Sequence, residues 1–299
     1  MAELSAVVVT YNAVPYVEPC LESVEGLETI VVDHGSTDGT LDLVRVRFPA
    51  ATVIEQENRG LAAGWNTGIR ATSTKHVVVL NSDAWLTGEA ADGLVRFADG
   101  VPRAGWIAPR LVNPDGSLQP SVRGFPTPWR LATEYLFLRK LAPRSRLLNG
   151  FYGAGFPHDE VREVDFAKAA CFLIRREAFD EVGPFDEAFF LFSEETDWCY
   201  RARSAGWRTL FFPGAEAVHV GGASWRRESA ALFREQVRGH LRFLVKHRGA
   251  PAAERARKVI LAGLRLRSLV FRGERRDVYR GAADWLAGSS TTALLESKS

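Results

Sequence analysis

Val77-Val78-Val79-Leu80-Asn81-Ser82-Asp83 decides the predicted fold, because a run of strand-forming apolar residues ends here in three polar ones. Such a run is typical of a strand buried inside a parallel sheet. In an open α/β sheet, ligands bind at the carboxyl ends of the strands. Asn81 and Asp83 point to the same side of an extended chain, so we expect them to present oxygen atoms to one point. Oxygen ligands suit a hard divalent cation; a plain strand followed by an Asx turn is the alternative.

Three earlier segments show the same pattern, a β-branched run that ends in small polar residues. They are Leu4 to Thr10, followed by Tyr11-Asn12; Thr29 to Val32, followed by Asp33 to Gly39; and Thr52 to Ile54, which leads to Asn58-Arg59-Gly60. Apolar residues at helical spacing follow the first and third strands: Val17, Cys20, Leu21 and Val24, then Trp65 and Ile69. This alternation predicts a right-handed βαβ series, and hence an α/β fold with a mostly parallel central sheet flanked by helices.

Five blocks of sequence, spread over residues 4 to 226, follow one another in a fixed order. They are Val31 to Thr40 (VVDHGSTDGT), Asn58 to Gly68 (NRGLAAGWNTG), Leu80 to Asp83 (LNSD), Phe192 to Cys199 (FSEETDWC) and Val218 to Ser224 (VHVGGAS). Together they resemble the motifs of family 2 glycosyltransferases with the Rossmann-like GT-A fold. Among subfamilies the chain is most similar to bacterial rhamnosyltransferase-like enzymes of cell-surface polysaccharide and cell-wall assembly.

The resemblance implies a binding site for a nucleoside diphosphate sugar along the polar ends of the strands. The residues that it assigns to the nucleotide are Thr10, Tyr11, Asn12, Asp33, Ser36, Asn58, Gly60, Asn66, Asn81 and Ser82. In the family the carboxylate at Asp33 accepts the N3–H of uracil or thymine, a charge-assisted hydrogen bond. Both bases carry this donor, so the contact does not separate UDP from dTDP. Tyr11 has the alternative of being an ordinary core residue.

The resemblance also implies a metal ion that bridges the phosphate oxygens, held by Asp83 and His219 and with Asn81 as a further candidate ligand. A carboxylate together with an imidazole is compatible with Mn²⁺ and is less natural for Mg²⁺. The alternative is that His219 has a structural role only. We expect Mn²⁺ or Mg²⁺ as the cofactor.

The acidic pair Glu194-Glu195 matches the family segment that supplies the catalytic base. Glu195 takes the position of the base, and Glu194 is expected to orient the substrate or the base. Consecutive residues of a helix diverge by about 100°, so the two side chains should not share one task. The alternative is an acidic helix start favoured by the macrodipole. One base without a second catalytic carboxylate implies single displacement, and hence inversion at the anomeric carbon.

The sequence departs from the family pattern at several positions. His34 stands where Asn is common, and Asn81 replaces the first acidic residue of the DxD motif. Lys168-Ala169 occupies a place where relatives often have Ser-Gly. Because a methyl group blocks close approach that Gly allows, this last change puts the donor or acceptor pocket in question.

Composition agrees with one large domain plus an appendage: 299 residues, of which 46% are hydrophobic. Three scattered cysteines without metal spacing indicate reduced thiols and a cytoplasmic location. The sequence enters a strand directly after Met1 and contains no apolar run of about 18 residues, so we expect neither a signal peptide nor a membrane span. Asn113 to Thr127 and Asn149 to His158, which are rich in Pro or Gly, are expected to be loops.

Charge is concentrated in the C-terminal part of the sequence. From Arg226 to Arg280 there are sixteen Lys or Arg and five acidic residues, a net charge of +11, so that the rest of a chain with formal net charge +2 carries −9. Apolar residues at near-helical spacing in this part predict basic amphipathic helices, which suit the inner face of an anionic membrane. The alternative is that they pack on the catalytic domain with their arginines in solvent. No nucleic-acid-binding module accompanies the charge, so nucleic acid is not expected as a partner.

We therefore expect a GT-A catalytic domain over residues 1–226, with a nucleotide-binding part (1–112) and an acceptor part (113–226), followed by a helical basic region (227–299). The predicted function is inverting, metal-dependent transfer of a sugar from a donor such as dTDP-rhamnose or a UDP-sugar to a hydroxyl of a glycan or lipid-linked acceptor. A catalytically silent carbohydrate-binding or scaffold protein is the alternative, since a fold does not guarantee activity. The sequence lacks the Gly-rich phosphate loop expected of a nucleotidyltransferase near its first strand. It also lacks the GxGxxG motif expected of a nicotinamide dehydrogenase after that strand.

Overall fold

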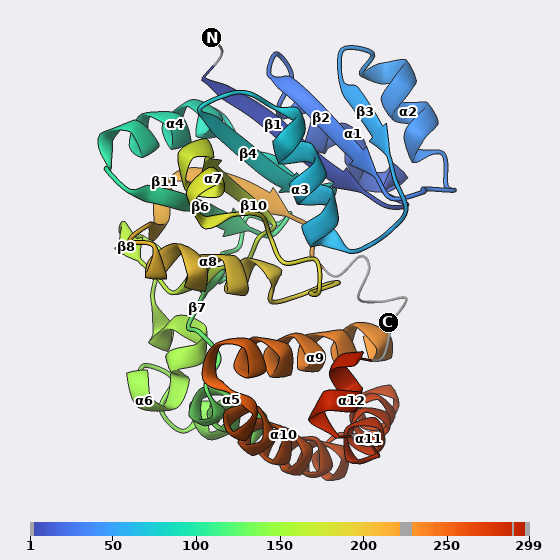
Figure 1. Ribbon diagram of the computed structural model, residues 1–299, viewed down its shortest axis with the longest axis vertical. Coiled ribbons are helices and arrows are strands. Elements are labelled where there is room, and N and C mark those ends of the chain that lie inside the picture. Colours follow the sequence, from blue (N-terminus) through green and yellow to red (C-terminus); the bar gives the residue numbers. More distant parts are fainter. Residues whose placement is uncertain (1–2, 222–228, 289, 297–299) are drawn as a thin grey trace.

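Strands and helices alternate along the first third of the chain in the computed structural model, which describes residues 3–221, 229–288 and 290–296. Figure 1 shows an α/β part at the top and a group of helices below it, with the C-terminal helices α9 to α12 in the lower part. The strands of the main sheet are β1 (Leu4–Thr10), β2 (Glu28–Asp33), β3 (Thr52–Glu55), β4 (His76–Asn81), β5 (Ala84–Leu86), β6 (Ala104–Val112), β8 (Arg162–Glu163), β10 (Cys171–Arg175) and β11 (Arg208–His219).

The main sheet has the order β3-β2-β1-β4-β10-β6-β11-β5, with β8 paired to β11. The pairs β2–β3, β1–β2, β1–β4 and β6–β11 are parallel, whereas β10 is antiparallel to both neighbours. The predicted α/β fold with a mostly parallel sheet is therefore confirmed. The predicted strand ends are close: β1 matches its segment, and β2 extends it by one residue at each end.

Alternate residues of the central strands face two hydrophobic layers, as the period of two in a strand requires. In β1, Val7 and Val9 pack into the layer that contains α3, whereas Ala6 and Val8 pack into the layer that contains α1 and α4. The helices that accompany the sheet are α1 (Val14–Glu22), α2 (Thr40–Arg47), α3 (Leu61–Ala71), α4 (Ala90–Gly100), α7 (Arg176–Val182) and α8 (Glu194–Ser204).

One strand of a second, two-stranded sheet lies in a segment predicted as loop. β7 (Val122–Arg123) pairs with β9 (Phe166–Ala167), so the loop expected over Asn113 to Thr127 contains a short strand that the sequence did not indicate. The second expected loop contains the 3₁₀ helix η2 (Gly150–Gly155). The strand β7 forms through pairing with a distant segment, which the local composition did not indicate. The remaining elements here are α5 (Pro128–Tyr135), η1 (Leu138–Lys140) and α6 (Arg146–Asn149).

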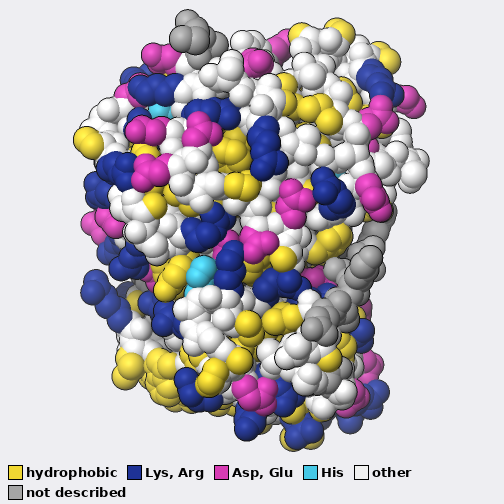
Figure 2. All heavy atoms as spheres, in the orientation of Figure 1, with side chains coloured by type: hydrophobic (Ala, Val, Ile, Leu, Met, Phe, Trp, Pro, Cys, Tyr) yellow, Lys and Arg dark blue, Asp and Glu magenta, His cyan; other side chains and the backbone are white. Residues whose placement is uncertain are grey.

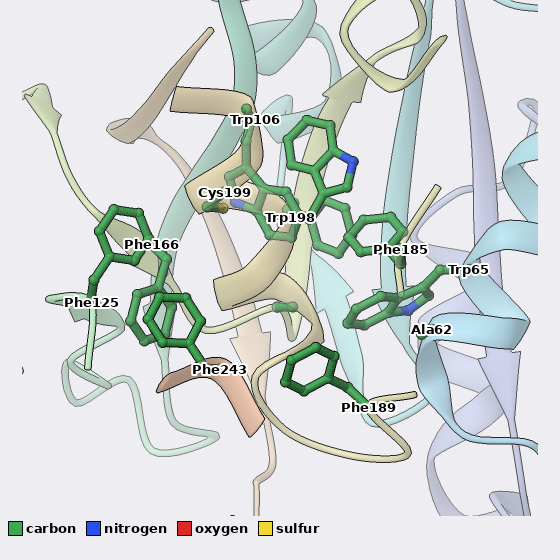
Figure 3. Close-up of a cluster of buried hydrophobic side chains, with 14 of the residues drawn as sticks. Ala62, Trp65, Trp106, Phe125, Phe166, Phe185, Phe189, Trp198, Cys199 and Phe243 are labelled. Atoms are coloured by element: carbon green, nitrogen blue, oxygen red, sulfur yellow. The ribbon is translucent and has the colours of Figure 1, made fainter. Parts of the chain in front are cut away.

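Aromatic side chains fill the layer between the sheet, α3 and α8 (Figure 3). Trp106 stacks on Phe172, with ring centroids 3.7 Å apart, and Trp198 of α8 lies 5.7 Å from Phe185. Phe125 stacks at 6.0 Å on Phe243, which belongs to a C-terminal helix. The same hydrophobic layer thus continues from the sheet into the C-terminal helices.

The basic C-terminal region is helical, as predicted, and its apolar residues face inward. Its helices are α9 (Ser229–Arg248), α10 (Ala250–Val270), α11 (Glu274–Ala287) and α12 (Thr291–Glu296). The predicted amphipathic faces are largely buried at Leu232, Val237, Leu241, Leu244, Ile260 and Leu264. These apolar faces therefore pack against the rest of the protein, as the alternative reading expected, and they are not available to a membrane. The predicted domain boundary at 226/227 lies outside the described residues, and the division into domains stays a prediction.

Asp197 of α8 joins this region to the α/β part of the chain. Its fully buried carboxylate accepts from Arg201 at 2.9 Å and from Lys246 and His247 of α9 at 2.8 and 2.7 Å. Burial alone would raise the pKa of Asp197, but the hydrogen bonds from His247, Lys246 and Arg201 outweigh it and lower the pKa to about 2. The expected helix ion pair of Asp197 and Arg201 is thus part of a larger buried cluster.

No helix in the described ranges is both long and apolar enough to cross a bilayer.

Asp197→Asn should lower the free energy of unfolding by about 3 kcal/mol, because Arg201, Lys246 and His247 lose the buried carboxylate that they share. Urea denaturation measures the change. Since the folded-state pKa lies below the ordinary value, the stabilisation is present above pH 4 and is lost as the pH falls toward 2, so the two proteins should converge there. Asp277→Asn, which removes an exposed i,i+3 pair with Arg280, is the control and should change stability by about 0.5 kcal/mol or less. Equal effects of the two substitutions would contradict the role of the cluster.

Candidate functional site

The predicted metal ligands Asp83 and His219 lie together at the edge of the sheet. Asp83 follows the end of β4, and the next residue, Ala84, pairs with His219 across the antiparallel strands β5 and β11. The backbone N–H of Val220 donates to the carbonyl of Asp83 at 3.0 Å. This register places His219 Nε2 3.5 Å from Asp83 Oδ1, with both side chains partly exposed. The two atoms can therefore face one cation.

Gln119 fixes the ring of His219. Its carboxamide nitrogen donates to the carbonyl of His219 at 3.1 Å and to Asn113 Oδ1 at 2.9 Å, which orients the amide. Its oxygen then accepts from His219 Nδ1 at 2.7 Å. With the proton on Nδ1, the lone pair of Nε2 points away from Gln119 and is free for a metal. Gln119 was not found from the sequence, because nothing local in its segment indicates contact with a residue so far along the chain.

The donor set fits a cation that is shared with a diphosphate. No group of three or more His, Cys, Asp or Glu that could hold a metal occurs among residues 3–221, 229–288 and 290–296. Two protein ligands would leave most coordination positions to phosphate oxygens and water, as is usual for metals at nucleotide sites. Asn81 Oδ1 is buried and has no hydrogen-bond partner in the described part of the chain, so it is a further available acceptor. Ser82, between them, is half-buried.

The residues predicted to bind the nucleobase of the donor form one hydrogen-bonded group at the ends of β1 and β2. The buried carboxylate of Asp33 accepts from Thr10 Oγ1 at 2.8 Å, from Ser36 Oγ at 2.5 Å and from the backbone N–H groups of Gly35 and Ser36 at 2.9 and 2.8 Å. These four donors match the four lone-pair positions of a carboxylate. Asp33 therefore organises the turn that follows β2.

Asn12 and Tyr11 lie at the exposed side of this group. Asn12 adopts a left-handed conformation (φ 51°), and its Oδ1 accepts from the backbone of Thr37 at 2.8 Å. Its own N–H donates to Ser36 Oγ at 2.9 Å. Tyr11 is 55% exposed, so the alternative of an ordinary core residue was wrong. Its ring is free to contact a base.

Asn58, Gly60 and Asn66 instead hold the segment that leads into α8. Both ends of the buried Asn66 carboxamide bond the backbone of Phe185, at 2.9 Å each. Asn58 Oδ1 accepts from the N–H of Gly60. Gly60 has φ 92°, and a Cβ there would lie 2.1 Å from the carbonyl oxygen of Phe190. These three residues position a loop, and their contact with a nucleotide stays a prediction.

The acidic pair begins α8. Phe192 and Ser193 before it are both left-handed (φ 67° and 73°), a conformation that strains residues with a side chain. Glu194 is buried, whereas Glu195 is partly exposed, and one carboxylate oxygen of each has no hydrogen-bond partner in the described ranges. Burial, followed by the charge of Glu195, raises the pKa of Glu194. Burial raises the pKa of Glu195 to about 7, although N–H groups at the start of α8 and Arg123 oppose the shift.

Arg123 and Lys168 accompany the base and were not assigned a role from the sequence. They lie in the small sheet, where the backbone N–H of Lys168 donates to the carbonyl of Ser121. Burial, followed by the charge of Arg123, lowers the pKa of Lys168 to about 8. Two residues after Lys168, the carbonyl of Ala170 accepts from the N–H of Asn81 at 2.9 Å. The departure Lys168-Ala169 thus directly precedes the residue that bonds the backbone of Asn81. The residues Gly222 to Ser224 of the fifth block lie outside the described residues.

The sequence model described as Glycosyl transferase family 2 matches residues 5–183. The N-acetylglucosaminyl-diphospho-decaprenol L-rhamnosyltransferase of Mycobacterium tuberculosis (strain CDC 1551 / Oshkosh) is 30% identical over 248 residues, which cover 76% of this chain and 79% of that protein. The low-salt glycan biosynthesis hexosyltransferase Agl10 of Haloferax volcanii is 26% identical over 205 residues, which cover 67% of this chain and 62% of that protein.

Two solved structures are similar in fold. The mannosyltransferase PcManGT of Pyrobaculum calidifontis, in complex with GDP-Man and Mn²⁺, has a TM-score of 0.56 and 17% identity, covering 98% of this chain and 84% of that one. GalNAc-T7 with UDP, GalNAc and Mn²⁺ has a TM-score of 0.58 and 14% identity, covering 98% of this chain and 56% of that one. At these identities the likeness shows the GT-A fold alone.

Asp83→Ala should abolish Mn²⁺ binding in the presence of a nucleoside diphosphate, because a methyl group cannot hold a cation. Gln119→Leu should weaken Mn²⁺ binding about tenfold to a hundredfold, the usual effect of losing a partner that orients a metal-ligating His. Titration followed by the Mn²⁺ electron paramagnetic resonance signal measures both. Asp277→Ala, which removes an exposed carboxylate of α11 paired with Arg280, is the control. Unchanged Mn²⁺ affinity in Asp83→Ala would refute the metal assignment.

Glu195→Gln should keep donor affinity and lower kcat roughly a hundredfold or more, the scale of losing a general base. In the unsubstituted protein, kcat should fall as the pH drops through about 7, since the base must be ionised, and this limb should be absent in Glu195→Gln. Steady-state kinetics between pH 5 and pH 9 test this expectation. Glu274→Gln removes an exposed carboxylate from the first turn of α11 and serves as the control. If Glu194→Gln alone loses activity, the two roles are reversed.

Proposed function

This chain belongs to glycosyl transferase family 2, and from that premise we propose that it is an inverting, metal-dependent enzyme that transfers a sugar to a lipid-linked glycan acceptor. As a member it is a glycosyltransferase of the GT-A type, which moves a sugar from a nucleotide sugar. The observation that carries the proposal is the 3.5 Å approach of His219 Nε2 to Asp83 Oδ1 at the carboxyl edge of the sheet.

Asp83 and His219 would hold a divalent cation, with Gln119 keeping the His219 Nε2 lone pair available. When bound, the cation supplies charge stabilisation for the departing diphosphate. Imidazole among the ligands favours Mn²⁺ over Mg²⁺. The solved structures of similar fold that contain Mn²⁺ support this choice of ion.

Glu195 would take the proton of the acceptor hydroxyl as that oxygen attacks the anomeric carbon. A carboxylate with a pKa of about 7 is a better base near neutral pH than an ordinary one, because it binds a proton more tightly while a substantial part of it is still ionised there. Burial and the charge of Glu195 also raise the pKa of Glu194, which would orient the substrate or Glu195. No second carboxylate is assigned to the opposite side of the sugar, so the expected result is inversion in a single displacement.

The first strands would bind the base of the donor, with Tyr11 against its face and Asp33 at its N3–H. Asp33 already accepts four hydrogen bonds, so one donor has to turn away. The Ser36 hydroxyl can do so, since it rotates freely and also accepts from Asn12. We propose dTDP-rhamnose as the donor and UDP-sugars as the second choice, a preference supported by the rhamnosyltransferase relative.

The acceptor would be a sugar on a polyprenyl diphosphate carrier, and the protein would meet it at the cytoplasmic face of a membrane. The mycobacterial relative, an N-acetylglucosaminyl-diphospho-decaprenol L-rhamnosyltransferase, supports this acceptor class. A catalytically silent carbohydrate-binding protein remains the second candidate, supported by Asn81 and Lys168-Ala169 at positions where the family pattern differs.

A panel of dTDP, UDP and GDP and their sugars, each with and without Mn²⁺, tests the donor proposal by thermal shift. Pyrimidine diphosphates with Mn²⁺ should raise Tm the most, since the resemblance assigns Asp33 to the N3–H of uracil or thymine. A ligand at 100 times its Kd should stabilise the fold by about 2.7 kcal/mol. Transfer to a lipid-linked N-acetylglucosamine acceptor, followed by mass spectrometry, separates the enzyme from the silent alternative. Preference for GDP, or binding without transfer to any acceptor, would contradict the proposal.

A further inference from the structure

Large hydrophobic side chains are exposed on one region of the helical part. Six of them lie on α5, on the segment through η1 and α6, and at the end of α10. We call this group the apolar patch, and its members are Trp129, Leu141, Leu147, Leu266, Leu269 and Val270. Leu141 and Leu269 are 77% and 82% exposed. A group of large apolar side chains exposed together is typical of a surface that binds a partner or a membrane.

The members of the apolar patch come from elements in mutual contact. Trp129 Nε1 donates to the carbonyl of Leu147 at 2.8 Å, which joins α5 to α6. The guanidinium of Arg267 in α10 lies 4.7 Å from the ring of Phe137, and Phe137 lies 6.2 Å from Phe271. The end of α10 is thus beside the residues that begin η1. Figure 2 shows hydrophobic side chains gathered at the lower left, over α6 and its neighbours, with Lys and Arg side chains close to them.

Basic residues surround the apolar patch. Residues 138–148 and 265–272 contain seven Lys or Arg and no Asp or Glu. The exposed members of this set, which we call the basic rim, are Lys140, Arg144, Arg146, Arg265 and Arg272. Charges of one sign around exposed apolar side chains are complementary to a surface that is anionic outside and apolar inside. An anionic bilayer has this chemistry.

We propose that the apolar patch inserts into the headgroup region of an anionic bilayer while the basic rim contacts the lipid phosphates. The C-terminal helices were the first candidates for this contact, but their apolar faces are buried against the core. The docking surface is therefore built half from the chain between the start of α5 and the end of α6 and half from the end of α10, where Leu266, Leu269 and Val270 are exposed.

The same segment leads to the predicted base. The guanidinium of Arg139 lies 4.6 Å from the ring of Tyr152, and that of Arg123 lies 4.6 Å from the same ring. The charge of Arg123 in turn acts on Glu195. The ring of Tyr152 thus contacts both Arg139, from the segment that carries Leu141, and Arg123. Resting on the proposed function, this arrangement brings the sugar of a lipid-linked acceptor toward Glu195 while its chain stays in the membrane.

A single labelled cysteine tests insertion, because the three native cysteines are all buried. Leu141→Cys carrying an environment-sensitive fluorophore should show a blue shift with vesicles of phosphatidylglycerol and phosphatidylcholine, and none with phosphatidylcholine alone. The shift should diminish as salt rises from 0.1 M to 1 M, where the Debye length falls from about 10 Å to about 3 Å. Val46→Cys is the matched control, since Val46 is equally exposed (77%) but lies on α2, distant from α6 in Figure 1. An equal shift at both positions would overturn the proposal.

The double substitution Leu141→Asp with Leu147→Asp should reduce co-sedimentation with anionic vesicles by roughly tenfold or more, because a charge at each position opposes insertion. Val46→Asp should leave co-sedimentation unchanged. Hydrolysis of the free sugar nucleotide should be the same in all three proteins. If the unsubstituted protein hydrolyses the sugar nucleotide but does not bind anionic vesicles, the docking surface alone is refuted. Vesicle binding without transferase activity would refute the proposed function alone. A concentration-dependent dimer that the double substitution abolishes, without vesicle binding, would assign the apolar patch to a second copy of the chain and overturn the proposal.

Discussion

The antiparallel pairing of β5 with the end of β11 is the constraint on which the predicted site depends. It brings His219 to Asp83 through backbone hydrogen bonds, which fix the register before any side chain is placed. A slip of one residue would turn His219 to the other face of the sheet. Gln119 then adds what the register cannot supply, since it determines which imidazole nitrogen is free. The chemistry of this edge follows from strand geometry first and side-chain hydrogen bonding second.

The predicted base depends on contacts from three directions. Asn66 and Gly60 hold the loop before α8 against α3, and Asp197 ties α8 to α9. Gly239 of α9 allows the strained turn at Ser193 to approach, because a Cβ there would lie 2.8 Å from Ser193 Oγ. Two buried carboxylate oxygens without a hydrogen-bond partner in the described ranges and a strained turn are costly, and a rigid surrounding is what lets them persist. The C-terminal helices therefore take part in holding the geometry of the predicted base.

The same helices separate two kinds of surface that the composition had merged. Most of their apolar residues belong to the core, and Arg257 and Arg267 form ion pairs with Glu254 and Glu134. The apolar side chains of the patch that stay exposed lie in equal number on the chain from α5 to α6 and at the end of α10. A net charge of +11 over Arg226 to Arg280 correctly indicated a basic region, but the charge count gave no information on which apolar residues remain outside.

The sequence by itself determined the strands that carry the site, because the continuous apolar runs of β1, β2 and β4 and the polar residues at their ends are local properties. It also determined the acidic start of α8 and, through the order of five blocks, the family. The tertiary structure alone decided which distant residues meet: Gln119 with His219, Arg123 with Tyr152, and Asp197 with His247. It alone decided the raised pKa of Glu195, since burial is a property of packing. Local periodicity fixes elements, whereas the partners of a polar side chain depend on how those elements are brought together.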